Sequence, residues 1–189
     1  MIDQKKIILA SQSPRRRELL AAMRFPYEAI SLDVDESFPA DMPAEEVAAY
    51  LAEKKAKAYT LKTDELVIAS DTVVVVDGKV LGKPADADEA FQMLQSMSGK
   101  QHQVISGFCI RDEHQQVVGD ETTEVFFREL EAEEINYYIE HYKPYDKAGA
   151  YGIQEWIGMI GISRIEGSYY NVMGLPVQQV YEELKNWSK

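Results

Sequence analysis

The sequence has little cysteine and no long apolar run. Its single cysteine, Cys109, cannot form an intramolecular disulfide, and no group of cysteine and histidine has the spacing of a zinc site. No window approaches the ~20 apolar residues that a membrane-spanning helix needs. The apolar run over residues 7–10 is too short for the core of a signal peptide. We therefore expect a cytoplasmic protein without a membrane partner.

Positive charge is also scarce. The chain carries 20 Lys and Arg against 32 Asp and Glu, a net charge of −12. Because phosphate neutralisation needs a net basic face, we expect no nucleic-acid partner. The 189 residues are 46% hydrophobic, and Pro, Gly and Ser never gather into a linker. The composition therefore predicts one folded domain over residues 1–189.

Three common enzyme motifs are missing as well. Without a Walker A motif, a G-x-G-x-x-G or a G-x-S-x-G, P-loop, Rossmann and serine-hydrolase chemistries are disfavoured. The hydrophobic pattern instead predicts a mixed α/β fold with parallel and antiparallel pairing. We expect strands over residues 5–10, 27–32, 102–111, 115–128 and 158–166, a hairpin at Asp77-Gly78, two apolar runs interrupted at residues 70–72, and helices starting at Pro14 and Pro176 and over residues 44–61, 86–97 and 132–141.

The segment ASQSPRRRELL places three arginines at the start of a predicted helix. Ser13 is a candidate N-cap and Pro14 suits the first helical position. Positive side chains at residues 15–17 oppose the helix dipole unless an anion binds there, and a helix N-terminus with the hydroxyls of Ser11 and Ser13 is suited to a phosphate. The alternative is a solvated helix end whose arginines pair with Glu18. Both interpretations remain open from the residues alone.

Carboxylates form the second group of candidates. Asp71 lies among valines, where a charge is costly unless it is paired or bound to a metal. It is either a metal ligand or general base, or a strand-end residue that caps a turn with Thr72. The loop that carries Asp33, Asp35 and Glu36 offers oxygen ligands suited to Mg²⁺ bound to phosphates, although acidic loops are commonly just exposed.

Two further segments could contact a ligand. Lys83 is flanked by Gly82 and Pro84, which restrict its direction more than that of an ordinary surface lysine. In the segment DKAGAYGIQ, small residues allow close backbone approach, and Lys147, Tyr151 and Gln154 could contact a base or ribose. The alternatives are an exposed loop lysine and a packed turn.

Taken in order, the segments ASQSPRR, VDE, LAEKKA, SDTVV, GKP, DKAGAYGIQ and YYNVMGLP closely resemble the Maf family of nucleoside triphosphate pyrophosphatases over about residues 8–176. The resemblance implies a fold similar to the inosine triphosphate pyrophosphatases: a long twisted mixed sheet flanked by helices, with two lobes around a cleft. It implies hydrolysis of dTTP and UTP to the monophosphate and pyrophosphate, with Mg²⁺ or Mn²⁺. It also implies a homodimer.

Two alternative functions remain beside the pyrophosphatase. A regulator of septum formation and cell division that binds nucleotides, with incidental hydrolysis, would need the cations but not two carboxylates, so an enzyme is favoured. The other alternative is a sugar-nucleotide or phosphosugar enzyme.

The resemblance also assigns roles to individual residues. By motif, the phosphate-binding residues are Ser13, Arg16, Lys55 and Lys83, and the base-specificity residues are Arg15, Thr72 and Gln154. The metal carboxylates are Glu36 and Asp71, and Asp71 is also the proton acceptor.

Overall fold

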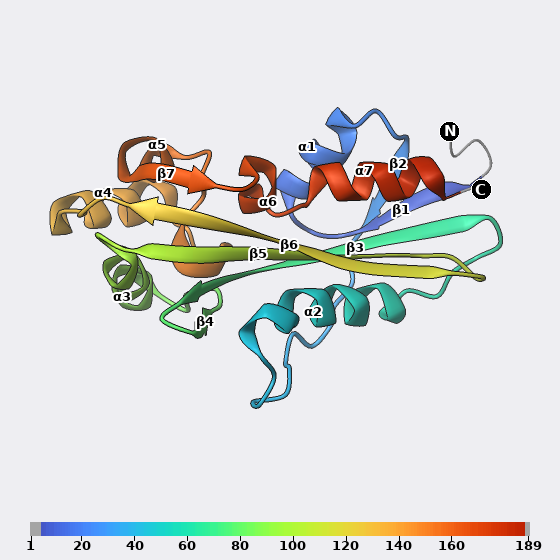
Figure 1. Cartoon of the computed structure of the whole chain (residues 1–189), viewed down its shortest axis with the longest axis horizontal. Helices are drawn as coiled ribbons and strands as arrows, with labels where there is room; N and C mark the ends of the chain where they lie inside the picture. The colour runs from blue at the N-terminus through green and yellow to red at the C-terminus, as the bar shows by residue number, and fades with distance from the viewer. Residues whose placement is uncertain (1–4, 188–189) are drawn as a thin grey trace. The chain divides into compact units, whose positions relative to one another are not determined.

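The computed structural model describes residues 5–187. Within this range seven strands form one mixed sheet in the order β2-β1-β3-β5-β6-β7, and β4 pairs with β3 (Figure 1). The mixed α/β class predicted from the sequence is confirmed. The strands are β1 (Lys6–Ala10), β2 (Tyr27–Ile30), β3 (Glu65–Val76), β4 (Lys79–Leu81), β5 (Gln101–Arg111), β6 (Gln116–Phe127) and β7 (Ile162–Glu166), and the helices are α1 (Pro14–Ala22), α2 (Ala44–Ala58), α3 (Ala87–Met97), α4 (Ala132–Tyr142), the 3-10 turn η1 (Ala148–Ala150), α5 (Trp156–Gly161), α6 (Tyr169–Met173) and α7 (Val177–Asn186).

The chain divides into two compact units. The first contains the described residues up to 72, residues 106–121, and the described residues from 174 onward. The second contains residues 73–105 and 122–173. The expectation of a single domain stays a prediction. Across residues 5–187, each helix is too short or too polar to cross a membrane.

The first unit is built on parallel strands covered by helices. β1 pairs in parallel with both β2 and β3, so that Ile7 lies opposite Tyr27 on one side and Leu66 on the other. In Figure 1, α2 lies on one side of these strands and α1 and α7 lie on the other. Small side chains bring α2 close: Ala52 and Ala56 belong to the core cluster of this unit. The covering helices bury both faces, which suits continuous apolar strands.

Antiparallel pairing occurs in the second unit. The β3–β4 hairpin turns at Asp77 (φ 48°) and Gly78 (φ 74°), the two positive φ values that a type I′ turn requires, so the predicted hairpin is confirmed. β6 pairs antiparallel with β7. Helix α3 packs against α4, and Gly99 (φ 68°) follows the end of α3 with the left-handed backbone that is common there.

Several boundary predictions were wrong. β3 continues through residues 70–72, because the polar side chains there find partners and the strand needs no interruption. Residues 156–161 form a helix before β7, since a short apolar run fits a buried helix as well as a strand. Helix α2 ends at Ala58 rather than residue 61, where Tyr59 turns to extended backbone. Helix α6 was not predicted from the sequence.

Candidate active site

The first turn of α1 is organised by two serines. Ser13 has extended backbone and accepts a hydrogen bond from Arg16 N at 3.4 Å, while Pro14 opens the helix. Ser11 Oγ accepts from Ser13 N at 3.1 Å. These bonds satisfy backbone donors that the helix itself leaves unpaired. The predicted N-cap is therefore confirmed, and the arginine side chains start from a fixed backbone.

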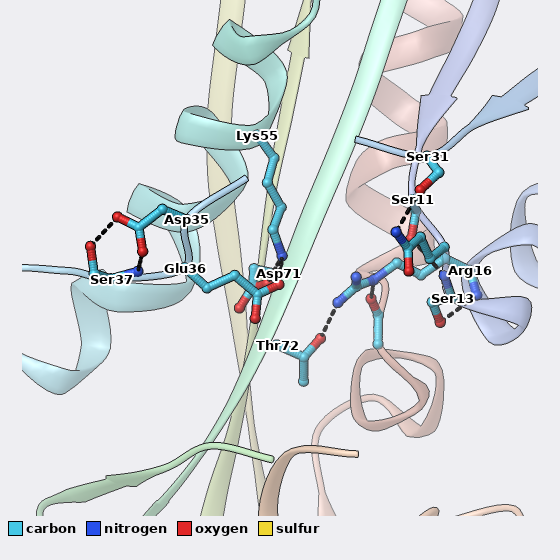
Figure 2. A network of polar contacts seen from close by, with 12 residues as sticks. Ser11, Ser13, Arg16, Ser31, Asp35, Glu36, Ser37, Lys55, Asp71 and Thr72 are labelled. Atoms are coloured by element: carbon cyan, nitrogen blue, oxygen red, sulfur yellow. Dashed lines mark hydrogen bonds and ion pairs between the residues drawn. The ribbon is translucent and has the colours of Figure 1, made fainter. Parts of the chain in front are cut away.

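Arg16 is held in place by the protein itself. Its Nε donates to the Gly174 carbonyl at 2.7 Å, and its Nη2 donates to Thr72 Oγ1 at 2.9 Å (Figure 2). A guanidinium has five N–H donors, so these two bonds fix its plane without exhausting its capacity. Burial lowers the pKa of Arg16, and the negative charge of Asp71 opposes that shift. The result is a preorganised cation.

The carbonyl and hydroxyl that hold Arg16 are themselves fixed. Gly174 has a φ of 120°, which only glycine adopts readily, and its carbonyl also accepts from Ser70 Oγ at 3.2 Å. Thr72 Oγ1 lies 2.8 Å from Ser106 Oγ on β5. Three segments that are distant in sequence from Arg16 therefore determine the direction of its guanidinium.

Two carboxylates meet at one lysine. Lys55 Nζ lies 2.7 Å from Glu36 Oε1 and also forms an ion pair with Asp71 Oδ1. Lys55 comes from α2, Asp71 from β3 and Glu36 from the loop before α2 (Figure 2). Asp71 is only 8% exposed, and a carboxylate so buried requires a partner. Lys55 supplies it.

The other lysines of α2 contact different groups. Lys54 Nζ donates to the Ser37 carbonyl at 2.9 Å and lies 3.2 Å from Asp35 Oδ2. Lys57 pairs with Glu53 one helical turn away, at 2.7 Å. Hydrogen bonds from Ser37 and Lys54 lower the pKa of Asp35 to about 2. Of this lysine cluster, Lys55 is the member that the structure brings to Asp71.

Asp71 and Thr72 are neighbours on β3 whose side chains contact different helices. Successive side chains of a strand point to opposite faces, and Asp71 contacts α2 whereas Thr72 contacts Arg16 of α1 (Figure 2). One stretch of strand thus presents a carboxylate on one side and a hydroxyl on the other. The arrangement combines preorganised hydrogen-bond donors with paired carboxylates.

The carboxylate pair fits a divalent cation. Among residues 5–187, no group of three or more His, Cys, Asp and Glu side chains is arranged to hold a metal. Mg²⁺, however, is commonly held by one or two carboxylates together with water and substrate phosphates. Glu36 and Asp71 already converge on the positive charge of Lys55. Their chemistry therefore suits a cation that completes its coordination with a phosphate ligand.

The structure places the remaining predicted residues on α1 or in the second unit. Lys83 and Gln154 belong to the second unit and are exposed, and Arg15 is half-buried on α1. The Gly149 N–H donates to the Gly82 carbonyl at 3.0 Å, so the segment before Gln154 is tied to the residue before Lys83. The substrate roles of Lys83, Gln154 and Arg15 stay predictions.

Two residues of the site were missed in the sequence analysis. Gly174 lies in the segment YYNVMGLP, and its isolated glycine was the available signal for a special backbone position. Ser106 interrupts the apolar run of β5, but a lone buried hydroxyl has no pattern that identifies its partner. Both act on Arg16, one directly and one through Thr72.

The fold and the site define an α/β protein whose guanidinium, ammonium and carboxylate groups are arranged for phosphate chemistry. The comparison with protein families is specific: the model of Maf-like proteins matches residues 6–187. The chain belongs to this family.

Relatives extend the likeness to the full length. The chain is 54% identical to a dTTP/UTP pyrophosphatase of Phocaeicola vulgatus, with 97% of each chain covered. It is 50% identical to a dTTP/UTP pyrophosphatase of Porphyromonas gingivalis, covering 100% of this chain and 97% of the relative. A solved structure of a HAM1 protein from Coxiella burnetii is 16% identical and has a TM-score of 0.53. The match covers 96% of this chain and 98% of the HAM1 chain. That last likeness concerns the fold alone, and it confirms the predicted fold class.

Proposed function

We propose that this protein hydrolyses dTTP and UTP to the nucleoside monophosphate and pyrophosphate. The observation that carries the proposal is the convergence of Glu36 and Asp71 on Lys55, close enough to Arg16 for their charges to act on it. Such a set can bind phosphates and also accept a proton, whereas a site for binding alone has little use for the carboxylates. The names of relatives about half identical over their full length support the same substrates.

In the proposed reaction, Asp71 accepts a proton from the water that attacks the α-phosphorus. The positive charges of Arg16 and Lys55 stabilise negative charge on the departing pyrophosphate, and their fixed positions avoid reorganisation during the step. Glu36 and Asp71 would hold Mg²⁺ or Mn²⁺. When bound, the cation polarises phosphate oxygens and neutralises their charge.

Base selection is proposed for Arg15, Thr72 and Gln154. An amide side chain can donate and accept at once, as the edge of uracil or thymine requires. Ser13 and Lys83 complete the proposed phosphate contacts. A cytoplasmic location, a homodimer and the lack of nucleic-acid and membrane partners stay predictions of the sequence.

The decisive assay is a panel of nucleoside triphosphates with Mg²⁺ or Mn²⁺, scored for pyrophosphate separately from phosphate. We expect pyrophosphate from dTTP and UTP, and slower turnover of GTP and CTP. Phosphate as the first product would refute the proposed reaction. Faster turnover of GTP or a methylated GTP would refute the proposed base preference.

The role of Asp71 has its own test. Asp71→Asn keeps the shape of the side chain but removes the proton acceptor, so we expect turnover to fall by about 10²–10⁴-fold with nucleotide binding retained. The matched control is Asp41→Asn, which changes an exposed carboxylate of the same loop as Glu36. Near-normal turnover of Asp71→Asn would remove Asp71 from the catalytic role.

A further inference from the structure

In the segment over residues 147–155, the exposed residue Gln154 follows a buried run. Residues 149–153 are all buried, whereas Gln154 is exposed. A long polar side chain on an unsupported loop would sample many rotamers, and ordering it on binding would cost affinity. The contacts beneath Gln154 therefore matter for what its amide can select.

A single buried hydroxyl holds the chain on both sides of Gln154. Tyr138 on α4 is fully buried. Its hydroxyl donates to Glu155 Oε2 and accepts the Gly152 N–H at 3.1 Å. Gln154 thus lies between Gly152 and Glu155, which both form hydrogen bonds with the Tyr138 hydroxyl.

Lys147 fixes the other oxygen of the same carboxylate. Its side chain is 7% exposed, and Nζ lies 3.1 Å from Glu155 Oε1 and 2.7 Å from Asp146 Oδ1. The space above Gly152 is closed by this pair, since a Cβ there would lie 3.0 Å from Glu155 Cδ and 3.2 Å from Lys147 Cε. Both Glu155 oxygens are therefore engaged, and the carboxylate has little freedom to rotate.

Two further contacts anchor the preceding part of the segment. The hydroxyl of Tyr151 lies 2.7 Å from His102 Nε2 on β5, and the rings of His102 and Tyr151 meet edge to face. Gly149 has a φ of 67°, and a Cβ there would lie 2.9 Å from Val74 Cγ2. The segment is consequently supported along its length. On either side of Gln154 it is held by the Tyr138 hydroxyl and by the bond from the Glu155 N–H to the Gly152 carbonyl at 3.0 Å.

The Tyr138 hydroxyl keeps its proton and so remains a hydrogen-bond donor. Burial raises its pKa, and the hydrogen bond to Glu155 raises it further. The proton therefore stays on the oxygen throughout the pH range in which the enzyme would be assayed. This leaves the lone pairs of the hydroxyl to accept from Gly152 while its proton is given to Glu155.

We propose that Tyr138, Glu155 and Lys147 are positioning residues for base selection, because they fix the backbone that carries the Gln154 amide. The inference rests on the proposed function, in which Gln154 reads the edge of uracil or thymine. Cytosine presents a donor where these bases present an acceptor. A fixed amide distinguishes the two, whereas a mobile amide can rotate to suit either.

The test is a double-mutant cycle on the ratio of kcat/KM for UTP to that for CTP. Tyr138→Phe removes both bonds with one atom, and we expect it to lower the ratio by about 5–30-fold, chiefly through the KM for UTP. In a Gln154→Ala background the same change should alter the ratio by less than about twofold, because the amide is gone. Tyr137→Phe, an exposed tyrosine on the same helix, is the matched control and should leave the ratio unchanged.

An equal loss of activity toward UTP and CTP in Tyr138→Phe would mean a merely structural role and would overturn the inference. So would a full effect of Tyr138→Phe without Gln154. If Tyr138→Phe does not fold, Glu155→Gln takes its place: it weakens the contact with Lys147, and an unchanged ratio would equally refute positioning.

A second measurement does not depend on turnover. Amide hydrogen exchange at residues 152–155 should be at least about tenfold faster in Tyr138→Phe than in the unaltered protein, and unchanged protection would overturn the inference. Failure of the proposed function looks different. In that case the unaltered protein itself releases no pyrophosphate from dTTP or UTP, whatever Tyr138→Phe does to exchange.

Discussion

Replacing Arg16 by lysine keeps the positive charge but removes the planar fork of donors. In the structure, Nε and Nη2 reach two different acceptors, the Gly174 carbonyl at 2.7 Å and Thr72 Oγ1 at 2.9 Å. A lysine ammonium is a point charge on a flexible stem and cannot reproduce that fixed geometry. We expect it to keep one acceptor and leave the other without its donor.

The expected loss follows from that single bond. A hydrogen bond to a charged group contributes about 1.5–3 kcal/mol. The acceptor that loses Arg16 keeps its other partner, Ser70 for the Gly174 carbonyl or Ser106 for Thr72, so no further penalty is added. Arg16→Lys should therefore lower the free energy of unfolding by about 1.5–3 kcal/mol. For a chain of this size, roughly 2–4 °C per kcal/mol predicts a fall in Tm of about 3–12 °C. We also expect kcat/KM for dTTP to fall about tenfold or more.

Arg17→Lys is the matched control. Among residues 5–187, the Arg17 guanidinium donates to one acceptor, the Ser11 carbonyl, at the longer distances of 3.2 and 3.4 Å. Urea denaturation of both variants at one pH, with dTTP kinetics alongside, separates the two cases. We expect less than about 1 kcal/mol for Arg17→Lys. If Arg16→Lys were within about 0.5 kcal/mol of the unaltered protein, the two bonds of Arg16 would not contribute as argued.

Other parts of the structure make further predictions. Burial would raise the pKa of Asp112, but hydrogen bonds led by that from Lys5 hold this pKa below its ordinary value. The resulting stability is present above the ordinary pKa and is lost as the pH falls toward the lowered pKa. Urea titrations should therefore show Asp112→Asn destabilised at neutral pH but approaching the unaltered protein below about pH 4. Gly107→Ala places a Cβ 2.3 Å from the carbonyl carbon of Ala48, and thermal denaturation should report a loss of about 1–3 kcal/mol or more. Burial raises the pKa of the Cys109 thiol to about 12, so a thiol reagent at about pH 8 should label it only on unfolding, and rapid labelling of the folded protein would contradict its burial.

Features whose causes lie within a few residues could be predicted from the sequence. Ser13 and Pro14 specify the start of α1, because the capping oxygen and its backbone partner are three residues apart. Asp77 and Gly78 specify the hairpin, because their own φ values set the turn. Where an apolar run fits both a strand and a helix, as for residues 158–161, the predicted strand was wrong.

Contacts between distant residues could not be predicted in this way. The bond from Arg16 to Gly174 joins residues 158 positions apart, and nothing in either neighbourhood encodes the other. The buried tie between Tyr138 and Glu155 is similar, since neither residue has a pattern that distinguishes it from its neighbours. The resemblance to a family supplied the candidate residues of the site, and the structure adds how they are held.

Residues 70–72 show why a polar interruption in an apolar strand can mislead. The pattern Ser-Asp-Thr among valines suggested a break between two strands, because an unpaired buried carboxylate is too costly to sit in a sheet. The break does not occur, since Lys55 from α2 pairs with Asp71 and the strand continues. An apolar side chain at position 71 would need no such partner, and in general such a replacement leaves the free energy of unfolding unchanged or raises it. Packing alone therefore does not account for a carboxylate there, and proton acceptance by Asp71 in the proposed reaction does.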